Sequence, residues 1–443
     1  MLAEDPRNDR NKMSTAYLQC IETSCQRRYP LDSASHRCTA CGDLLDVKYD
    51  FALAEPGALR TTWQQRKTSG TAQDQSGVWR FREMLPFVPH GKSVVTLSEG
   101  RTPLLDVPQA GEWAGGVRVA IKHQGNNPTG SFKDLGMTAC ITQAALVGSR
   151  VTACASTGNT SASMAAYAVR AGMKAVVFVP QGKISAAKLA QALEFGAVVV
   201  EIGDNFDQAF HLLRELPPEL GLYLVNSLNP FRLEGQKTIV LEILEQREWK
   251  VPDYIVVPGG NLGNVSAIGK GLAELQHAGL IEKLPRLVVV QADGANPFYQ
   301  MLASGAAQIR PVAEPHTEAT AIRIGDPVNW KKALRALNLT EGLCESVSDA
   351  QIFEAKAALA HDGVGCEPAS AATLAGIRKL TRAGKIERGA DVVAVLTGHQ
   401  LKDPESGLRR RSEADLSRQR LQVEADPKKL RAAMENILQL SVS

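Results

Sequence analysis

A lysine stands where a predicted strand turns into a predicted helix. Lys133 lies in the segment Asn-Asn-Pro-Thr-Gly-Ser-Phe-Lys-Asp, residues 126–134, in which Asn-Pro and Thr-Gly mark a turn. A lysine whose pKa is lowered in a cleft can form a Schiff base with a carbonyl group. The same segment could also be an ordinary capped helix with a surface lysine, because Ser131 or Thr129 could cap it.

Two further loops could bind anions. Residues 156–160, Ser-Thr-Gly-Asn-Thr, follow a predicted strand and would expose backbone N–H groups at a helix N-terminus, although an ordinary N-cap explains them equally well. Residues 258–264, Pro-Gly-Gly-Asn-Leu-Gly-Asn, would let the backbone approach a phosphate closely. This second loop lacks the G-x-G-x-x-G order and the P-loop ending, so it indicates a single phosphate rather than a pyrophosphate.

A fourth polar loop, residues 396–403 with the sequence LTGHQLKD, ends another predicted strand. Open α/β sheets bind ligands beyond the carboxyl ends of their strands, so the Thr397 hydroxyl is expected in that crevice. A lone histidine in such a loop is more often structural than catalytic, so no catalytic role is predicted for His399.

Half of the eight cysteines fall in one short window: Cys20, Cys25, Cys38 and Cys41. The C-x4-C and C-x2-C pairs, 12 residues apart, match a closed tetrahedral zinc site. Disulfides, which are rare in the cytoplasm, and a ribbon without metal are the alternatives. No catalytic role is expected, because four thiolates leave no ligand position open. The remaining cysteines are expected to be buried small apolar residues: Cys140, Cys154, Cys344 and Cys366.

The elements that must position these loops follow an α/β pattern from about residue 94 onward. Short apolar runs alternate with alanine-rich segments of helical period that end at glycine, such as residues 161–170 and 185–194. Such strands indicate a mainly parallel sheet covered on both faces. The predicted strands are residues 117–121, 151–155, 175–179, 197–202, 221–225, 254–257, 287–291 and 392–396, and a terminal helix is predicted over residues 421–440.

Composition and charge argue against several classes of protein. The 443 residues are 44% hydrophobic and 22% charged, which is ordinary for a globular protein. The net charge of +3 gives no reason to expect a nucleic acid or a membrane as partner. No apolar run approaches the length of a membrane-spanning helix, and the charged N-terminus has no apolar core of a secretory signal. We therefore expect a cytoplasmic protein.

Taken together and in order, these motifs resemble the threonine synthase family of fold-type II pyridoxal-phosphate enzymes. The resemblance runs from about residue 17 to residue 404 and includes SEGRTPL (98–104), NPFRLEGQKT (229–238) and EPASAA (367–372). It implies an α/β fold like that of the tryptophan synthase β subunit, with two open, mainly parallel sheets and the active site between two domains. A small N-terminal zinc ribbon is implied as well.

The domain boundaries implied by the resemblance divide the chain into four parts. Residues 1–50 would form the N-terminal arm and ribbon. Residues 51–124 and 226–402 would form a large cofactor-binding domain, and residues 125–225 a smaller domain with the lysine and Ser-Thr-Gly-Asn loops. Residues 403–443 would form a charged helical tail. Three residues depart from the family pattern and put the local loop shape in question: Asp326, Asn329 and Gln400.

The resemblance assigns roles around the cofactor. Lys133 would carry pyridoxal phosphate as a Schiff base and then act as a mobile acid and base, Asn159 would bond the 3′-oxygen, and Thr397 would face the ring nitrogen. Because a hydroxyl is not an anion, Thr397 would leave the cofactor a weaker electron sink than an aspartate would. The cofactor phosphate would be held by the backbone of Gly260, Asn261, Leu262, Gly263 and Asn264.

The implied reaction converts O-phosphohomoserine into threonine and phosphate, which requires two more anion sites. The expected ligands of the substrate carboxylate are Ser156, Thr157 and Thr160. The expected ligands of the substrate phosphate are Asn226, Ser227 and Arg232, with Lys183 as a further candidate. The Cα proton and a Cβ proton would leave, phosphate would depart from Cγ, and water would add at Cβ.

Other assignments remain open from the sequence. Threonine and serine dehydratases share the lysine and glycine loops but need no substrate-phosphate site, and cysteate synthase also takes a phosphorylated amino acid. The low net charge disfavours a zinc-ribbon protein that binds nucleic acid, and the intact Lys133 disfavours a non-catalytic regulatory paralogue. A homodimer is expected because dimers are the commonest oligomers.

Overall fold

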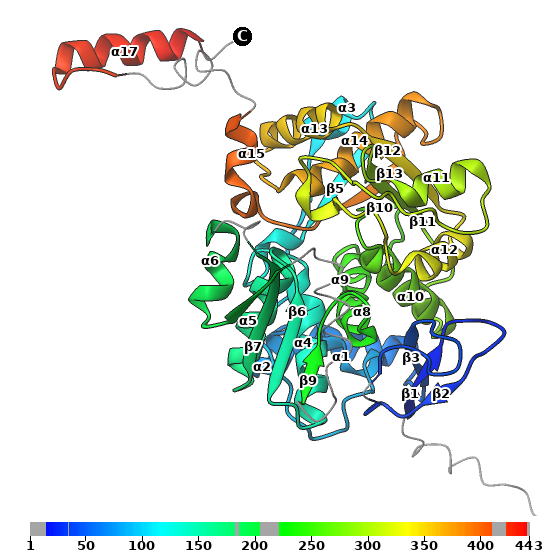
Figure 1. Ribbon diagram of the computed structural model, residues 1–443. Coiled ribbons are helices and arrows are strands. Elements are labelled where there is room, and N and C mark those ends of the chain that lie inside the picture. The colour runs from blue at the N-terminus through cyan, green and yellow to red at the C-terminus, as the bar shows by residue number, and fades with distance from the viewer. Residues whose placement is uncertain (1–14, 34, 182–185, 204–220, 410–421, 441–443) are drawn as a thin grey trace, which may run out of the picture. The chain divides into compact units, whose positions relative to one another are not determined.

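A computed structural model describes residues 15–33, 35–181, 186–203, 221–409 and 422–440 (Figure 1). The chain divides into two compact units, Met1–Lys402 and Asp403–Ser443, and each is described by itself. The second unit contains helices α15 (Pro404–Arg409) and α17 (Pro427–Leu440). Within the described ranges, no helix combines the length and the apolar character needed to cross a bilayer.

The larger sheet of the first unit has six strands in the order β12-β11-β10-β13-β5-β4, and only the pairing of β4 with β5 is antiparallel. Its strands are β4 (Leu104–Asp106), β5 (Arg118–His123), β10 (Tyr254–Pro258), β11 (Arg286–Ala292), β12 (Leu343–Val347) and β13 (Asp391–Leu396). Successive residues of β10 alternate between two separate apolar cores, Ile255 and Val257 on one face and Tyr254 and Val256 on the other. Both faces of this sheet are therefore buried, which explains its nearly unbroken apolar strands.

Helices cover the two faces of the larger sheet (Figure 1). One face packs against α9 (Thr238–Gln246), α10 (Gly263–His277) and α12 (Trp330–Leu339). The other face packs against α3 (Pro108–Trp113), α13 (Asp349–His361) and α14 (Pro368–Arg382).

The smaller sheet has four parallel strands in the order β8-β7-β6-β9. They are β6 (Val151–Ala155), β7 (Lys174–Pro180), β8 (Val198–Ile202) and β9 (Leu222–Leu224), accompanied by α4 (Lys133–Leu146), α5 (Asn159–Arg170) and α6 (Ala186–Glu194). A core of its own fills this part of the molecule, and it includes Met137, Tyr167 and Val177.

The N-terminal ribbon is a three-stranded antiparallel sheet of β1 (Thr15–Cys20), β2 (Arg28–Tyr29) and β3 (Leu45–Asp50), in the order β2-β1-β3. Its buried residues Leu18, Leu45 and Val47 join the core that also underlies the larger sheet. The remaining elements of the first unit are α1 (Pro56–Arg66), α2 (Ala72–Gln75), η1 (Trp79–Met84), η2 (Gln124–Asn126), α8 (Pro230–Gln236), α11 (Pro297–Ser304), η4 (Thr320–Ile322) and η5 (Gln400–Lys402).

The predicted fold class is confirmed, and the predicted strands are found within a few residues of their expected ends. Strands β4 and β12 were not predicted. Strand β12 has the sequence LCESV, whose Glu345 and Ser346 interrupt any apolar run, yet both side chains are buried. The terminal helix begins at Pro427 rather than Leu421, and Leu421 lies outside the described residues.

Candidate active site

The lysine loop and the Thr397 loop lie side by side at the carboxyl ends of β5 and β13. The backbone N–H of Phe132 donates to the Thr397 carbonyl at 2.9 Å, and the N–H of His399 donates to the Gly130 carbonyl at 2.9 Å. These bonds hold the start of α4 against the end of β13. Lys133, the first residue of α4, therefore stands at the predicted crevice.

A buried carboxylate holds the turn before Lys133. Asp134 accepts hydrogen bonds from the Thr129 N–H at 2.7 Å, the Thr129 hydroxyl at 2.5 Å and the Ser163 hydroxyl at 2.6 Å. The helix cap is Phe132, whose side chain makes no capping bond. The Ser131 hydroxyl also accepts the Lys133 N–H at 3.4 Å, as the alternative of a capped helix predicted, but the Lys133 side chain is half-buried rather than exposed.

The Lys133 amine has neither a hydrogen bond nor an ion pair within the described residues, and it lies 4.1 Å from the centroid of the Phe132 ring. Burial and the nearby Arg232 guanidinium lower the pKa of Lys133 to about 7, against the opposing effect of the Glu367 carboxylate. A neutral amine is the nucleophile that forms a Schiff base. Half of the Lys133 side chains would be in this form near neutral pH.

This lowered pKa predicts how Lys133 reacts. Because only the neutral amine is nucleophilic, labelling of Lys133 by an amine-directed reagent should increase with pH through a midpoint of about 7. That midpoint is about three units below the value for lysine in a free peptide. Peptide mapping of cofactor-free protein labelled across this pH range measures it, with a lysine-containing peptide as control. A midpoint equal to that of the peptide would contradict the role of burial.

Close helix packing brings Arg232 to Lys133. Arg232 lies on α8, and α8 contacts α4 through glycines: a Cβ added to Gly235 would lie 1.7 Å from the Leu135 carbonyl oxygen. A Cβ added to Gly136 would lie 2.9 Å from the Arg232 carbonyl oxygen. The two helices can approach this closely only because both glycines lack side chains. The lysine and the arginine thereby share one site, although they are far apart in sequence.

Arg232 is a buried cation with no carboxylate partner within the described residues. Its side chain is 2% exposed, its Nη1 donates to the Val225 carbonyl at 3.1 Å, and its Nε is buried without a partner. Burial lowers the pKa of Arg232. Glu234, two residues along α8, is itself buried and binds Tyr49 and Lys237. A buried, unpaired guanidinium is costly unless an anion binds it.

The glycine loop between β10 and α10 also offers buried polar atoms. Leu262 adopts a left-handed conformation with φ of 61°, and α10 begins at the next residue. Both amide atoms of the Asn264 side chain are buried and have no hydrogen-bond partner among the described residues. A Cβ on Gly260 would lie 3.1 Å from the Ala321 carbonyl oxygen, so a larger residue here would fit only tightly. Unpaired buried amide atoms at a helix N-terminus fit the predicted phosphate group.

Glu367 joins two predicted cofactor ligands. Its carboxylate accepts hydrogen bonds from Asn159 Nδ2 at 3.0 Å and from Thr397 Oγ1 at 3.2 Å. The Ser370 hydroxyl lies 3.0 Å from Thr397 Oγ1 and accepts the Thr397 N–H at 2.8 Å. Burial raises the pKa of Glu367, although its hydrogen bonds to Asn159 and Thr397 oppose that shift. Asn159 and Thr397 thus meet across one carboxylate.

Glu367 and Ser370 were not assigned a role from the sequence, although both belong to the motif at residues 367–372. Glu367 is the residue before the first turn of α14, and Pro368 occupies that turn. An acidic residue directly before a helix of small apolar residues was the available signal, because a carboxylate in such a setting must be paired or functional.

The predicted carboxylate loop lies between β6 and α5. Ser156, Thr157 and Thr160 are half-buried there, and the Gly158 N–H lies 3.4 Å from Ser156 Oγ. Asn226 connects this loop to β9, since its side chain accepts the Ala155 N–H at 3.2 Å and donates to the Ala155 carbonyl at 3.0 Å. The Asn226 amide is therefore largely engaged by backbone, which makes Arg232 the stronger candidate for the predicted phosphate site.

Of the three departures from the family pattern, Asn329 bonds directly to two predicted site residues. Its N–H donates to the Asn261 carbonyl at 3.3 Å and its Nδ2 donates to the Ser227 carbonyl at 3.1 Å. Asn329 thus connects the glycine loop to the predicted phosphate turn. Asp326 is exposed, and Gln400 packs against Gly365, where a Cβ would lie 2.0 Å from its amide oxygen. The candidate ligand Lys183 lies outside the described residues.

The four N-terminal cysteines are brought together. Their Sγ atoms all lie within 4.8 Å of one another, with 3.4 Å between Cys20 and Cys41 and 3.6 Å between Cys25 and Cys38. None of them forms a disulfide, so that alternative is wrong. A regular tetrahedron with Zn–S bonds of about 2.3 Å has edges of about 3.8 Å, and the thiols fit it. Of the other cysteines, Cys344 is half-buried and the rest are buried.

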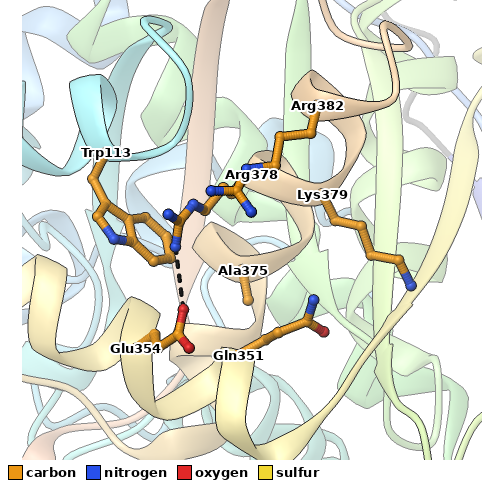
Figure 2. Close-up of a pocket in the computed structure, with 7 residues that line it drawn as sticks. All are labelled: Trp113, Gln351, Glu354, Ala375, Arg378, Lys379 and Arg382. Carbon is orange, nitrogen blue, oxygen red and sulfur yellow. Dashed lines mark hydrogen bonds and ion pairs between the residues drawn. The ribbon is translucent and has the colours of Figure 1, made fainter.

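A separate cavity lies between α3, α13 and α14 (Figure 2). Arg378 stands over the Trp113 indole, 3.9 Å from the ring centroid, and pairs with Glu354 at 3.2 Å. None of the predicted site residues lines this cavity. Its principal cation is already paired, so we assign it no part in the chemistry.

Comparison with known proteins places this geometry in a family. Residues 95–398 match the family of pyridoxal-phosphate dependent enzymes. The chain is 42% identical over 420 residues to the threonine synthase of Methanocaldococcus jannaschii, covering 95% of this chain and 99% of that protein. It is 45% identical over 391 residues to that of Methanosarcina acetivorans, covering 88% and 93%. The chain belongs to the threonine synthase family. The resemblance drawn from the motifs is confirmed.

A solved member of the threonine synthase family has the same fold. The Escherichia coli threonine synthase matches with a TM-score of 0.66, covering 95% of this chain and 99% of that chain at 21% identity. The chain is therefore a pyridoxal-phosphate-dependent lyase of fold type II, with an N-terminal cluster of four cysteines.

Proposed function

We propose that this enzyme eliminates phosphate from O-phosphohomoserine and adds water to give L-threonine. The observation that carries the proposal is Arg232, a buried guanidinium that pairs with no carboxylate in the part of the chain that the structure describes, beside an amine whose pKa is near 7. A dehydratase of threonine or serine needs no cation for a phosphate at Cγ. A site that holds both this lysine and this arginine can accommodate an amino acid that carries a phosphate group.

The residues present fit pyridoxal phosphate. Lys133 would hold its aldehyde carbon, Asn159 and Thr397 would bond its ring substituent and ring nitrogen, and residues 260–264 would receive its phosphate. The unpaired amide of Asn264 and the close approach at Gly260 support this assignment. When bound, the cofactor supplies an electron sink for negative charge that develops on the amino acid.

Lys133 is the proposed carrier of protons. With a pKa near 7, its amine can accept the Cα proton and later return a proton to the substrate carbon chain. A proton also leaves Cβ, and the Cγ–O bond breaks with its electron pair passing to the departing phosphate. Cγ then gains a proton and becomes a methyl group, and the oxygen of water bonds to Cβ. The remaining proton of that water passes to the released phosphate, and Cα regains a proton.

Arg232 is proposed to bind the substrate phosphate and to stabilise the charge that grows on it as the Cγ–O bond breaks. Ser227 contributes at the same turn, with Lys183 as a candidate further cation. The loop of Ser156, Thr157 and Thr160 is proposed to bind the α-carboxylate at the N-terminus of α5. The two anion sites would orient Cα toward Lys133 and Cγ toward Arg232.

A product assay tests the proposal. The holoenzyme incubated with O-phosphohomoserine should release phosphate and threonine in equal amounts, while threonine and serine should be deaminated far more slowly. Release of homoserine instead of threonine, or ready deamination of threonine with no reaction of O-phosphohomoserine, would contradict the proposed function.

Cys20, Cys25, Cys38 and Cys41 are proposed to bind one structural zinc ion. Their arrangement supports a closed site without an open position, and therefore a structural role. Metal analysis of freshly purified protein should find about one zinc per chain, and chelation should loosen residues 15–50 because metal binding is coupled to folding. The cofactor spectrum should change little. Protein that contains no zinc yet has a protease-resistant ribbon would overturn this proposal.

A homodimer remains a prediction from the frequency of dimers, which light scattering of the purified holoenzyme would check.

A further inference from the structure

The N-terminal ribbon contacts the helix that carries Arg232. Asn229 caps α8 by accepting the Phe231 N–H at 3.0 Å, and its side-chain amide lies 3.3 Å from His36 Nε2. His36 and Asn229 are both buried. Because the amide nitrogen can only donate, His36 Nε2 must be the acceptor. The ribbon thus supports the cap at the N-terminal end of α8.

A second ribbon residue holds the same helix one turn further on. Tyr49 of β3 donates its hydroxyl hydrogen to Glu234 at 2.6 Å, and Glu234 also binds Lys237 at 2.7 Å. Glu234 is fully buried and stands two residues after Arg232. These bonds keep the Glu234 carboxylate directed toward the ribbon and away from the Arg232 guanidinium.

The turn that leads into α8 packs on the ribbon as well. Leu228 forms a small apolar cluster with Ile21 and Leu44, which lie in the ribbon. Leu228 directly follows Ser227, a predicted phosphate ligand. The ribbon therefore contacts the turn, the cap and the middle of the segment that carries the predicted substrate-phosphate site.

The guanidinium group of Arg232 makes few contacts of its own, so its position depends on how α8 is held. It donates to one backbone carbonyl, and no carboxylate among the described residues pairs with it. The direction in which the Arg232 side chain points is consequently set by the backbone of α8. By contrast, the side-chain hydrogen bonds of His36 and Tyr49 go to Asn229 and Glu234, not to Lys133, Thr397 or the glycine loop.

We infer that the ribbon is a positioning element for the substrate-phosphate site, in which His36 and Tyr49 hold α8 so that Arg232 can bind the phosphate group. The inference rests on the proposed function. The ribbon thereby sets the affinity for the phosphorylated substrate and leaves the cofactor site unaffected. His36 and Tyr49 act through α8 and touch no reacting atom.

Kinetics of the full-length holoenzyme test this inference. Removing one hydrogen bond in His36→Ala should raise KM for O-phosphohomoserine by about twofold to tenfold, with kcat changed by less than about twofold. The inhibition constant of inorganic phosphate should rise by the same factor. His36→Gln keeps an acceptor near Asn229 and should restore KM. Tyr49→Phe, which removes only a hydroxyl, should raise KM in the same way, and it provides a second test should His36→Ala fold poorly.

Two controls separate positioning from general support of the fold. Arg28→Ala alters an exposed ribbon residue stacked on Tyr17 and should leave KM unchanged. In an Arg232→Ala background, His36→Ala should raise KM no further, because coupled residues give non-additive effects. Equal effects of His36→Ala with and without Arg232, or a parallel loss of cofactor affinity, would overturn the inference. If the wild type itself fails to release phosphate from O-phosphohomoserine, the proposed function falls instead.

Discussion

Replacing Lys133 with alanine should lower the turnover of O-phosphohomoserine by at least about 10²–10⁴-fold, the usual contribution of a positioned acid and base. The expected loss of turnover is at the upper end of this range or larger, because the same amine is proposed to hold the cofactor. Its environment supports both roles, since burial and the Arg232 guanidinium bring its pKa to about 7. Initial rates of phosphate release at saturating substrate measure the effect.

The matched control for this variant is Lys250→Ala, because the Lys250 side chain is 78% exposed and pairs only loosely with Glu248 at 3.5 Å. It should keep wild-type activity. In the wild type, borohydride reduction followed by peptide mapping should find the cofactor on Lys133. Reduced cofactor on another lysine, or full activity of Lys133→Ala, would show that the lysine is misassigned.

Replacing Arg232 with alanine should reduce kcat/KM for O-phosphohomoserine by about 10- to 100-fold. A hydrogen bond to a charged group contributes about 1.5–3 kcal/mol, and each 1.4 kcal/mol corresponds to about a factor of ten. The structure favours the larger value, because Arg232 is 2% exposed and none of the carboxylates that the structure describes pairs with it. Arg232→Lys should recover part of the loss, since lysine keeps the charge but lacks the planar fork of donors.

The defect of Arg232→Ala should be selective. The cofactor spectrum should stay normal because the cofactor phosphate is assigned to a different loop, and any reaction of an unphosphorylated amino acid should change little. Arg388→Ala, at a side chain that is 79% exposed, is the control and should have no effect. Unchanged kcat/KM in Arg232→Ala would mean that the substrate phosphate binds elsewhere.

Strands β10, β11 and β13 of the larger sheet could be predicted because burial on both faces leaves an almost unbroken apolar sequence, as in Tyr254–Pro258. Strand β12 could not, because its polar residues are buried through interactions that the sequence does not display. Glu345 pairs with Lys379, and Ser346 accepts a hydrogen bond from Asn296, which is 50 residues away. Tertiary partners thus override the local pattern in that strand.

The candidate site was only partly predictable for a similar reason. Lys133, Asn159 and Thr397 stand in recognisable loops after strands, so the rule that ligands bind at the carboxyl ends of strands located them. Glu367 connects to Asn159 across 208 residues, and this contact exists only in the folded chain. The approach of Arg232 to Lys133 depends on Gly136 and Gly235, whose role inside helices has no distinct local signature.

The central claim is that the Cγ–O bond of O-phosphohomoserine breaks and that water adds at Cβ, and reaction in water enriched in oxygen-18 tests it most directly. Breaking the Cγ–O bond leaves every phosphate oxygen from the substrate, while the new hydroxyl oxygen comes from water. Mass spectrometry should therefore find labelled threonine and unlabelled phosphate. Labelled phosphate accompanied by homoserine would show hydrolysis at phosphorus and would contradict the account.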